Sequence, residues 1–345
     1  MITRAVRPGN RGRVKEILIK YTEKMDYIWM LLLGSGFLLF SSFGFVRTAE
    51  RVAAGLRISP LVVGVVVLAV GTSLPELAVS GTAVVAGDAG LALGNIIGSN
   101  IVNIFLVLGI AILAGSMRIG TAKTQTTVAV LIAVSTGFLL IHLWNLPRFY
   151  AGMVFLTGSV GFTVYEYVLA LRGRRGVDRR IMDSYTRKRP LTAGDVITSL
   201  VYLSGIIIGG ILVVLSSENL AVRLGVSTTT LGLSFTAVIT SLPELLTTLF
   251  SQRDHQEKMS LGNIVGSNIY NILLIGGITM LFSEYEYIPP VDWFFFMAAT
   301  GMVLIITRWF RGRVVPRFVG VILILLTMWY FFSLSLPGII SGISY

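Results

Sequence analysis

The sequence contains no cysteine, which excludes disulfides and thiolate metal sites within the chain. Only 13% of its 345 residues are charged, whereas soluble domains average about 25%. Hydrophobic residues make up 54%, and the mean hydropathy is +0.81. This composition excludes an ordinary soluble domain and predicts a membrane protein. The only two histidines, His142 and His255, lie at the end of an apolar run and in a polar loop, where we expect solvated side chains.

The surplus of basic residues does not indicate nucleic acid as a partner. The formal net charge is +11, but Lys and Arg lie in short connections between apolar runs rather than along one face. Alternate connections contain 19 Lys and Arg residues on one side of the membrane and 2 on the other. By the positive-inside rule, the first set is predicted to be cytoplasmic. Both chain ends then face outward, together with seven basic residues of the N-terminal stretch.

Apolar runs of about twenty residues are long enough to cross a bilayer as a helix. Ten such runs are predicted, over residues 27–46, 60–86, 92–113, 126–144, 149–171, 195–217, 228–250, 260–282, 292–307 and 318–336. The predicted fold class is an all-α membrane protein with ten transmembrane helices. Its predicted domains are a basic N-terminal extension (1–26), a first five-helix repeat (27–171), a basic cytoplasmic loop (172–194) and a second five-helix repeat (195–345).

An internal repeat relates the two halves. The sequence Gly-Thr-Ser-Leu-Pro-Glu at 71–76 recurs as Ile-Thr-Ser-Leu-Pro-Glu at 239–244. Gly-Asn-Ile-Ile-Gly-Ser-Asn at 94–100 recurs as Gly-Asn-Ile-Val-Gly-Ser-Asn at 262–268, and both offsets are 168 positions. Because each half has an odd number of spans, the second half enters the membrane from the opposite side, which predicts inverted-topology repeats. Such proteins bind substrates near the midplane, at interrupted helices. The runs that contain the Pro-Glu pairs are therefore predicted to be broken helices 2 and 7.

The repeated motifs place oxygen atoms on matching helix faces. In an apolar run, an acid is expensive and indicates function by default. On a helix, Ala69, Thr72 and Ser73 share one face with Glu76, while Pro75 disturbs the backbone ladder and can free carbonyl oxygens. The following span of each half adds a Ser and an Asn four residues apart. The predicted site thus combines these residues with Ser99, Asn103, Ala237, Thr240, Ser241, Glu244, Ser267 and Asn271.

Two carboxylates among hydroxyl, amide and backbone oxygens suit a hard cation. Ca2+ accepts roughly six to eight oxygens in flexible geometry, and Na+ would use the same atoms. Mg2+ requires a stricter octahedron, and Zn2+ or Cu+ would favour nitrogen and sulfur ligands. Because two buried carboxylates need neutralising cations or protons, an empty carrier would reorient poorly. Exchange of ions, rather than a one-way leak, follows as a hypothesis.

Two structural alternatives remain open at this point. Ser73-Leu-Pro-Glu76 also has the form of a capping box, which would account for these residues at an ordinary helix start. Ser99 and Asn103 could likewise do no more than form hydrogen bonds between helices.

At these motifs the chain resembles the sodium/calcium exchanger family of the cation/calcium antiporter superfamily. The resemblance covers both halves and leaves out residues 1–26. It implies two inverted five-helix repeats, and alternating access by sliding of the first and sixth spans past a fixed core. It also implies that the twelve site residues are ion ligands, with the two alanines acting through their carbonyl groups.

Some positions depart from relatives of that family. Asn271 stands where some members, including potassium-dependent exchangers, have Asp, which argues against K+ co-transport. Gly98 and Gly266 stand where proton-coupled relatives tend to have an acid, which favours sodium coupling. No long regulatory domain is seen between the spans, so a prokaryotic plasma membrane is expected.

The leading hypothesis is therefore Na+/Ca2+ antiport with Glu76 and Glu244 as shared ligands. H+/Ca2+ antiport is an alternative, in which the carboxylates take protons. A cation channel could use the same oxygens as a selectivity site. No nucleophile and base pair is apparent in the spans, so we expect no enzyme activity and no cofactor besides the transported ions. The expected environment is the lipid bilayer, with the monomer as the functional unit.

Overall fold

The computed structural model describes residues 26–45, 47–48, 71–115, 117, 122–173, 192–253 and 257–341. Within these ranges the chain is helical and contains no β-strand, which confirms the predicted all-α class. Three sequence predictions fall partly or wholly outside the described residues. They concern the N-terminal extension up to residue 25, residues 174–191 of the basic loop, and Ala69 with the rest of residues 60–70.

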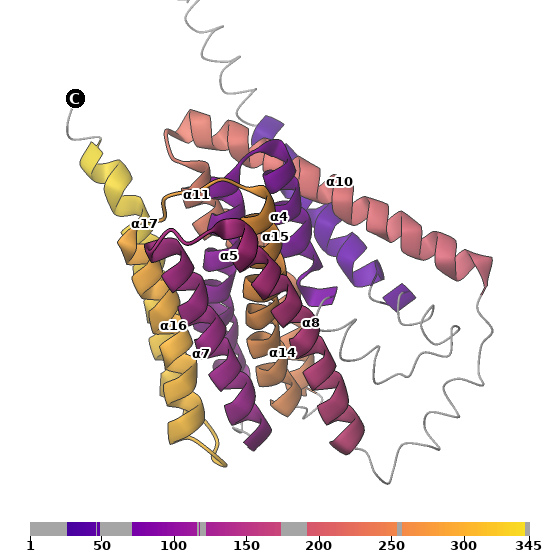
Figure 1. The fold of residues 1–345 in the computed structure, drawn as a ribbon, viewed down its shortest axis with the longest axis vertical. Coiled ribbons are helices and arrows are strands. Elements are labelled where there is room, and N and C mark those ends of the chain that lie inside the picture. Colours follow the sequence, from indigo (N-terminus) through magenta and orange to yellow (C-terminus); the bar gives the residue numbers. More distant parts are fainter. Residues whose placement is uncertain are drawn as a thin grey trace, which may run out of the picture.

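Ten helical segments make up the described part (Figure 1). Several consist of consecutive pieces joined by π-helical turns (η). In chain order they are Asp26–Phe45; α4 (Leu74–Ala86); α5 (Ala89–Val102), η2 (Asn103–Val107) and α6 (Leu108–Ala114); α7 (Ala122–Leu143); α8 (Arg148–Gly173); α10 (Ala193–Leu224); α11 (Thr228–Leu231), η3 (Gly232–Thr236), α12 (Ala237–Thr240) and α13 (Leu242–Arg253); α14 (Glu257–Tyr270), η4 (Asn271–Gly276) and α15 (Gly277–Phe282); α16 (Pro290–Trp309); and α17 (Arg317–Ser341).

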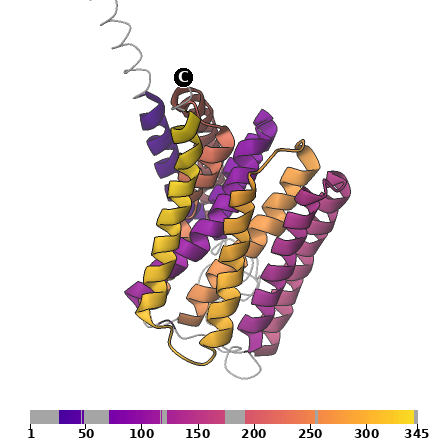
Figure 2. The same cartoon turned by 90° about the vertical axis from the view of Figure 1, so that its left-hand side faces the viewer.

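Eight of these described segments are long and apolar enough to cross a membrane. The other two are α8, which has 26 residues, and α4, which has 13. Large apolar side chains such as Leu33, Val201 and Ile305 are exposed on the surface of the bundle, as contact with lipid requires. Figure 2 shows the yellow α17 next to the orange α16, with the magenta α7 and α8 on the other side of α16, all as long helices.

The second and seventh spans are interrupted at matching serines. A turn at Ser73 precedes α4, and a turn at Ser241 separates α12 from α13. Their backbone angles are nearly the same, with φ −88° and ψ 10° at Ser73 and φ −80° and ψ 0° at Ser241. A proline follows two residues later in each case, where it cannot donate a backbone hydrogen bond. The predicted broken helices are confirmed.

Connections on the same predicted side of the membrane meet in the fold. The Val315 amide donates to the Met117 carbonyl at 2.8 Å, which joins two predicted cytoplasmic connections. At the opposite end, the Thr228 hydroxyl donates to Asp88 at 2.9 Å, and the Thr229 hydroxyl donates to Glu286 at 3.4 Å. Because these residues belong to different halves, the repeats interlock head to tail, as inverted topology requires.

Glycine allows close contact between the halves. A Cβ atom at Gly98 would lie 2.7 Å from the Ala237 side chain, and one at Gly232 would lie 2.7 Å from the Leu91 carbonyl. Helix α5 therefore packs directly against η3 and α12 of the other half. This contact brings the end of α12, with Thr240, next to the middle of α5.

The first helix and α10 pack against each other at one side of the bundle. Figure 1 shows α10 crossing obliquely, with the indigo first helix beside it. A Cβ atom at Gly34 would lie 2.7 Å from Leu212, and one at Gly209 would lie 2.7 Å from the Leu38 amide. Side chains of this pair form a small apolar cluster with α4 that is separate from the main core.

Two details differ from the sequence predictions. Helix α10 continues to Leu224, although 218–227 was predicted to be a connection, and Gly225 with φ 67° then ends it. Ser216 and Asn219 donate hydrogen bonds to carbonyls of their own helix, which satisfies these polar side chains within it. His142 was expected to be solvated, yet it is only 4% exposed. One ring nitrogen lies 2.8 Å from the Phe138 carbonyl and the other 3.2 Å from Arg148, which explains its burial. His255 lies outside the described residues.

Candidate functional site

Two carboxyl groups meet where the broken helices restart. Glu76 lies in the first turn of α4 and Glu244 in the first turn of α13, and both are 0% exposed. The two carboxyl groups are within electrostatic range of each other. None of their four oxygens has a hydrogen-bond partner among the described residues. Unpaired buried carboxylates are expensive, so this arrangement calls for a bound cation or a proton.

Hydroxyl groups from the opposite half approach each acid. Thr240 of the second half is the neighbour of the Glu76 carboxyl. Thr72 of the first half is the corresponding neighbour of the Glu244 carboxyl, together with Ser73 and Ser267. The motif is therefore assembled across the interface between the repeats. Glu244 has hydroxyl neighbours from both halves, and Glu76 has one from the second half.

Two hydroxyl pairs bridge the halves with nearly the same geometry. Thr72 Oγ1 lies 3.1 Å from Ser267 Oγ, and Thr240 Oγ1 lies 3.2 Å from Ser99 Oγ. All four side chains are buried. Since Thr240 and Ser267 lie 168 positions after Thr72 and Ser99, the second pair is the repeat image of the first.

The two predicted asparagines each begin a π-helical turn, at η2 and η4. Such turns occur frequently at functional sites. The Asn103 amide donates to Asn268 Oδ1 at 3.0 Å, and the Asn268 amide donates to the Asn100 carbonyl at 3.3 Å. The side-chain oxygens of Asn103 and Asn271 have no partner within the described part. Both oxygens are thus available to a ligand.

All predicted site residues that the structure describes are buried. The exception is Ala69, which lies outside the described residues. The Ala237 carbonyl accepts hydrogen bonds from the Ser241 amide at 3.1 Å and from the Thr240 hydroxyl at 3.4 Å. It could therefore bind an ion only by sharing or releasing these bonds.

Asn95 is a site residue that the sequence did not single out as a ligand. Its amide donates to Ser80 at 3.0 Å, and its Oδ1 accepts from the hydroxyls of Thr240 at 3.2 Å and Ser99 at 3.5 Å. The side chain thus positions hydroxyls of both halves. Its recurrence as Asn263 within the repeated motif was the only signal that could have marked it.

The site contains no nitrogen or sulfur ligand of the kind that transition metals prefer. In the described ranges no group of three or more His, Cys, Asp or Glu side chains could hold a metal ion. The charge is instead concentrated on two carboxyl groups within a shell of hydroxyl and amide oxygens. This donor set fits Ca2+ or Na+.

Comparison with known proteins identifies the family. The profile of the sodium/calcium exchanger protein family matches residues 27–172 and 195–336. The chain belongs to the sodium/calcium exchanger family. Within this family, the sodium/calcium exchanger MaX1 of Methanosarcina acetivorans is similar at 31% identity over 336 residues, covering 86% of this chain and 95% of MaX1.

Two further similarities concern location and fold. The inner membrane protein YrbG of Escherichia coli is 30% identical over 306 residues, covering 85% of this chain and 92% of YrbG. The solved structure of the sodium-calcium exchanger NCX_Mj soaked with zero Na+ and Ca2+ aligns with a TM-score of 0.57 at 26% identity, covering 89% of this chain and 98% of that one. The chain is thus a multi-pass plasma membrane protein with the exchanger fold of ten helices in two inverted repeats.

Proposed function

We propose that this member of the sodium/calcium exchanger family is a secondary active antiporter that exchanges Na+ for Ca2+, with Glu76 and Glu244 as shared ligands. The observation that carries the proposal is the pair of fully buried carboxyl groups without hydrogen-bond partners. A carboxylate in that state is stable only when a cation or a proton neutralises it. Competition between cations for one neutralising position is the physical basis of exchange.

The proposed ligands are the carboxylates, the hydroxyls and the two amide oxygens. The same residues as in the sequence prediction would contribute, with Ala69 and Ala237 acting through their carbonyl groups. Ca2+ tolerates irregular shells of oxygen ligands, so the mixture of donors suits it. Na+ would occupy subsets of the same atoms. Each chain carries a complete set, so we propose that the monomer transports ions.

We further propose alternating access by movement of the first helix and α10 against the remaining helices. Their packing supports this, because the two helices approach closely at Gly34 and Gly209, which have no side chain to block movement along the contact. The separate apolar cluster under these helices also shares few side chains with the main core. This cluster includes Val79 and Ala83 of α4, so α4 is the main surface past which the pair would slide.

H+/Ca2+ antiport is the second candidate, because the same unpaired carboxyl groups could bind protons. The absence of an acid at Gly98 and Gly266 favours sodium coupling. A third candidate is a cation channel, which could use the same oxygens as a selectivity site. These functions differ in which gradient drives calcium, so a flux measurement separates them.

The test is calcium uptake into proteoliposomes loaded with Na+ and diluted into Na+-free medium. We expect uptake that requires the outward Na+ gradient and that a pH gradient alone does not drive. Uptake driven only by the pH gradient would show that calcium transport is coupled to protons instead of Na+. Rapid downhill flux without a counter-ion would indicate a channel.

Variants test the ligands in the same assay. Glu76→Gln and Glu244→Gln should each abolish uptake, because the amide keeps the size of the side chain and removes its charge. Glu166→Gln in α8 is the matched control and should transport normally, since Glu166 lies outside the site. Transport by both site variants would disprove the proposed ligands.

A further inference from the structure

A pocket lined by two acids lies at the predicted outer end of the bundle, and none of its lining residues belongs to the proposed exchange site. Its volume is about 280 Å³. It is bounded by the start of α11, by the connection that leads into α16, and by α17 near Ser333. The polar groups that line it are Asp292, Glu286, Ser227, Thr229, Thr230 and Ser333. None of its described lining residues is Lys, Arg or His.

Asp292 is the unusual member of this pocket. It lies in the first turn of α16 and is only 1% exposed. Its Oδ1 atom has no hydrogen-bond partner among the described residues. The transport site proposed above does not use this acid. A buried carboxylate oxygen that faces a cavity without a partner lacks the neutralising group that burial requires.

The other oxygens of the pocket can complete a cation shell. Thr229 donates a hydrogen bond of 3.4 Å to Glu286 Oε1, so a hydroxyl and a second carboxylate already lie side by side. Arg148 is within electrostatic range of Glu286, but it donates to the Ser283 carbonyl and lies over the Tyr285 ring. Arg148 therefore offsets Glu286 in part and leaves Asp292 without a basic partner in the pocket.

We propose that this pocket is a second cation-binding site, with Asp292 as its buried carboxylate ligand and Glu286 with the hydroxyls of Thr229 and Thr230 as further oxygen ligands. The class of ligand is a hard cation, Ca2+ or Na+, since every donor is an oxygen. If the chain exchanges ions as proposed above, a cation would bind at this site before it reaches the centre of the membrane.

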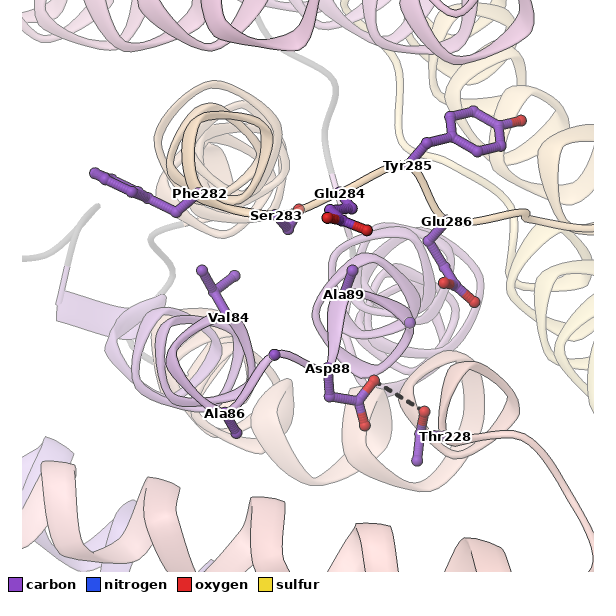
Figure 3. Close-up of a pocket in the computed structure, with 12 residues that line it drawn as sticks. Val84, Ala86, Asp88, Ala89, Thr228, Phe282, Ser283, Glu284, Tyr285 and Glu286 are labelled. Carbon is purple, nitrogen blue, oxygen red and sulfur yellow. Dashed lines mark hydrogen bonds between the residues drawn. The ribbon is translucent and has the colours of Figure 1, made fainter.

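A neighbouring pocket adjoins this site at Glu286. It has a volume of about 600 Å³ and shares Glu286 as a lining residue, together with Asp88 and Glu284 (Figure 3). Figure 3 shows Glu284 and Glu286 on one connection, facing the loop that carries Asp88 and its hydrogen bond to Thr228. Clefts lined by charge of one sign raise the local concentration of counter-ions. Asp292 would be the innermost acid of this series.

The site also contacts the broken helix of the exchange centre. The Tyr330 hydroxyl donates to the Leu233 carbonyl in η3 at 3.0 Å, and Asp292 is within electrostatic range of Tyr330. Thr229 and Thr230 belong to α11, the outer part of the same span. A cation held by Asp292 would therefore lie beside the helix that leads to Thr240.

A purely structural role is the competing explanation, because an acid in the first turn of a helix is stabilised by the helix dipole. The two explanations differ in cation binding. The test uses full-length protein in detergent with the exchange site disabled by Glu76→Gln and Glu244→Gln, and measures Ca2+ binding by equilibrium dialysis. We expect about one remaining Ca2+ site per chain, of lower affinity, whose occupancy Na+ reduces by competition.

Adding Asp292→Asn to that background should weaken the remaining site at least tenfold. Thr229→Val, which removes one hydroxyl at nearly constant volume, should weaken it several-fold and serves as a second probe if the Asp292 variant is unstable. Glu166→Gln in α8 is the control, because Glu166 lines neither this pocket nor its neighbour, and it should bind as the background does. No residual binding, or binding that neither probe changes, would overturn the proposal. Neither result bears on exchange at Glu76 and Glu244.

Discussion

The Thr72 hydroxyl lies 3.1 Å from that of Ser267, in the other half of the molecule. The repeat image of this contact, Thr240 with Ser99, has nearly the same length, 3.2 Å. The two halves thus supply the same pair of groups with their roles exchanged. A cation held between Glu76 and Glu244 would meet oxygens related by the repeat, so neither half would hold it alone.

This symmetry predicts that both serines contribute to calcium affinity. Ser99→Ala and Ser267→Ala should each raise the calcium concentration for half-maximal exchange by about tenfold, since hydrogen bonds or ligands to a charged group contribute roughly 1.5–3 kcal/mol. The maximal rate should change less. Calcium-dependent uptake in proteoliposomes measures both quantities.

The control for the serine variants is Ser159→Ala, because Ser159 is a buried serine of α8 that is not among the proposed ligands and whose hydroxyl donates to the Leu156 carbonyl. It should leave the calcium dependence unchanged. If both site variants behaved like this control, the hydroxyl pairs would be structural contacts only.

Removal of ions should destabilise the protein, because the two carboxyl groups then lack neutralising partners. Calcium at about a hundred times its dissociation constant should add about 2.7 kcal/mol to the stability of the native state. Thermal unfolding in detergent, with calcium and with a chelator, measures the difference in Tm. The double variant Glu76→Gln/Glu244→Gln should be more stable than the native chain in chelator, and calcium should raise its Tm less. If calcium did not change the Tm of the native chain, this expectation would be contradicted.

Close packing at Gly98 predicts a stability effect that depends on position. In Gly98→Ala the new methyl group would lie 2.7 Å from both the Ala237 side chain and the Leu233 carbonyl. Overpacking of this kind destabilises by about 1–3 kcal/mol. Gly301→Ala in α16 is the matched control, since a Cβ atom there meets nothing within 4 Å and should stabilise the helix by about 0.5–1 kcal/mol. Thermal unfolding should show Tm shifts of opposite sign, and equal shifts would disprove the packing argument.

Much of this arrangement could be predicted from one repeated motif. The constant offset of 168 residues required matching roles for Glu76 and Glu244, and the prolines that follow Ser73 and Ser241 located the helix breaks. These features are local or periodic, so the sequence displays them directly. Inverted topology then followed from the odd number of spans.

Other parts of the site depend on contacts that no local pattern encodes. Asn95 and Asn263 occupy equivalent repeat positions, yet only Asn95 has its amide donor bonded, while Asn263 Nδ2 has no partner in the described part. The burial of Asp292 depends on how α16 and α17 pack, and the pairing of His142 with Arg148 depends on the turn between α7 and α8. Such contacts are set by tertiary packing and become visible only in the structure.

The charge of the exchange site predicts electroneutral transport. With Asn271 in place of an acid, the site has two carboxylates, and one Ca2+ or two Na+ would neutralise them equally. One turnover then moves the same charge in each direction. Calcium uptake driven by a Na+ gradient should therefore not change when a potassium diffusion potential is imposed across the proteoliposome membrane.

Asn271→Asp provides the matched test of this charge count. A third carboxylate admits a third Na+ against one Ca2+, so each Ca2+ taken up would be accompanied by one net positive charge moving out. An interior-positive potential should then accelerate uptake and an interior-negative one should slow it, since about 100 mV acting on one charge amounts to about 2.3 kcal/mol. Potential-dependent uptake by the unmodified chain would show that charge beyond the two carboxylates takes part in the exchange cycle.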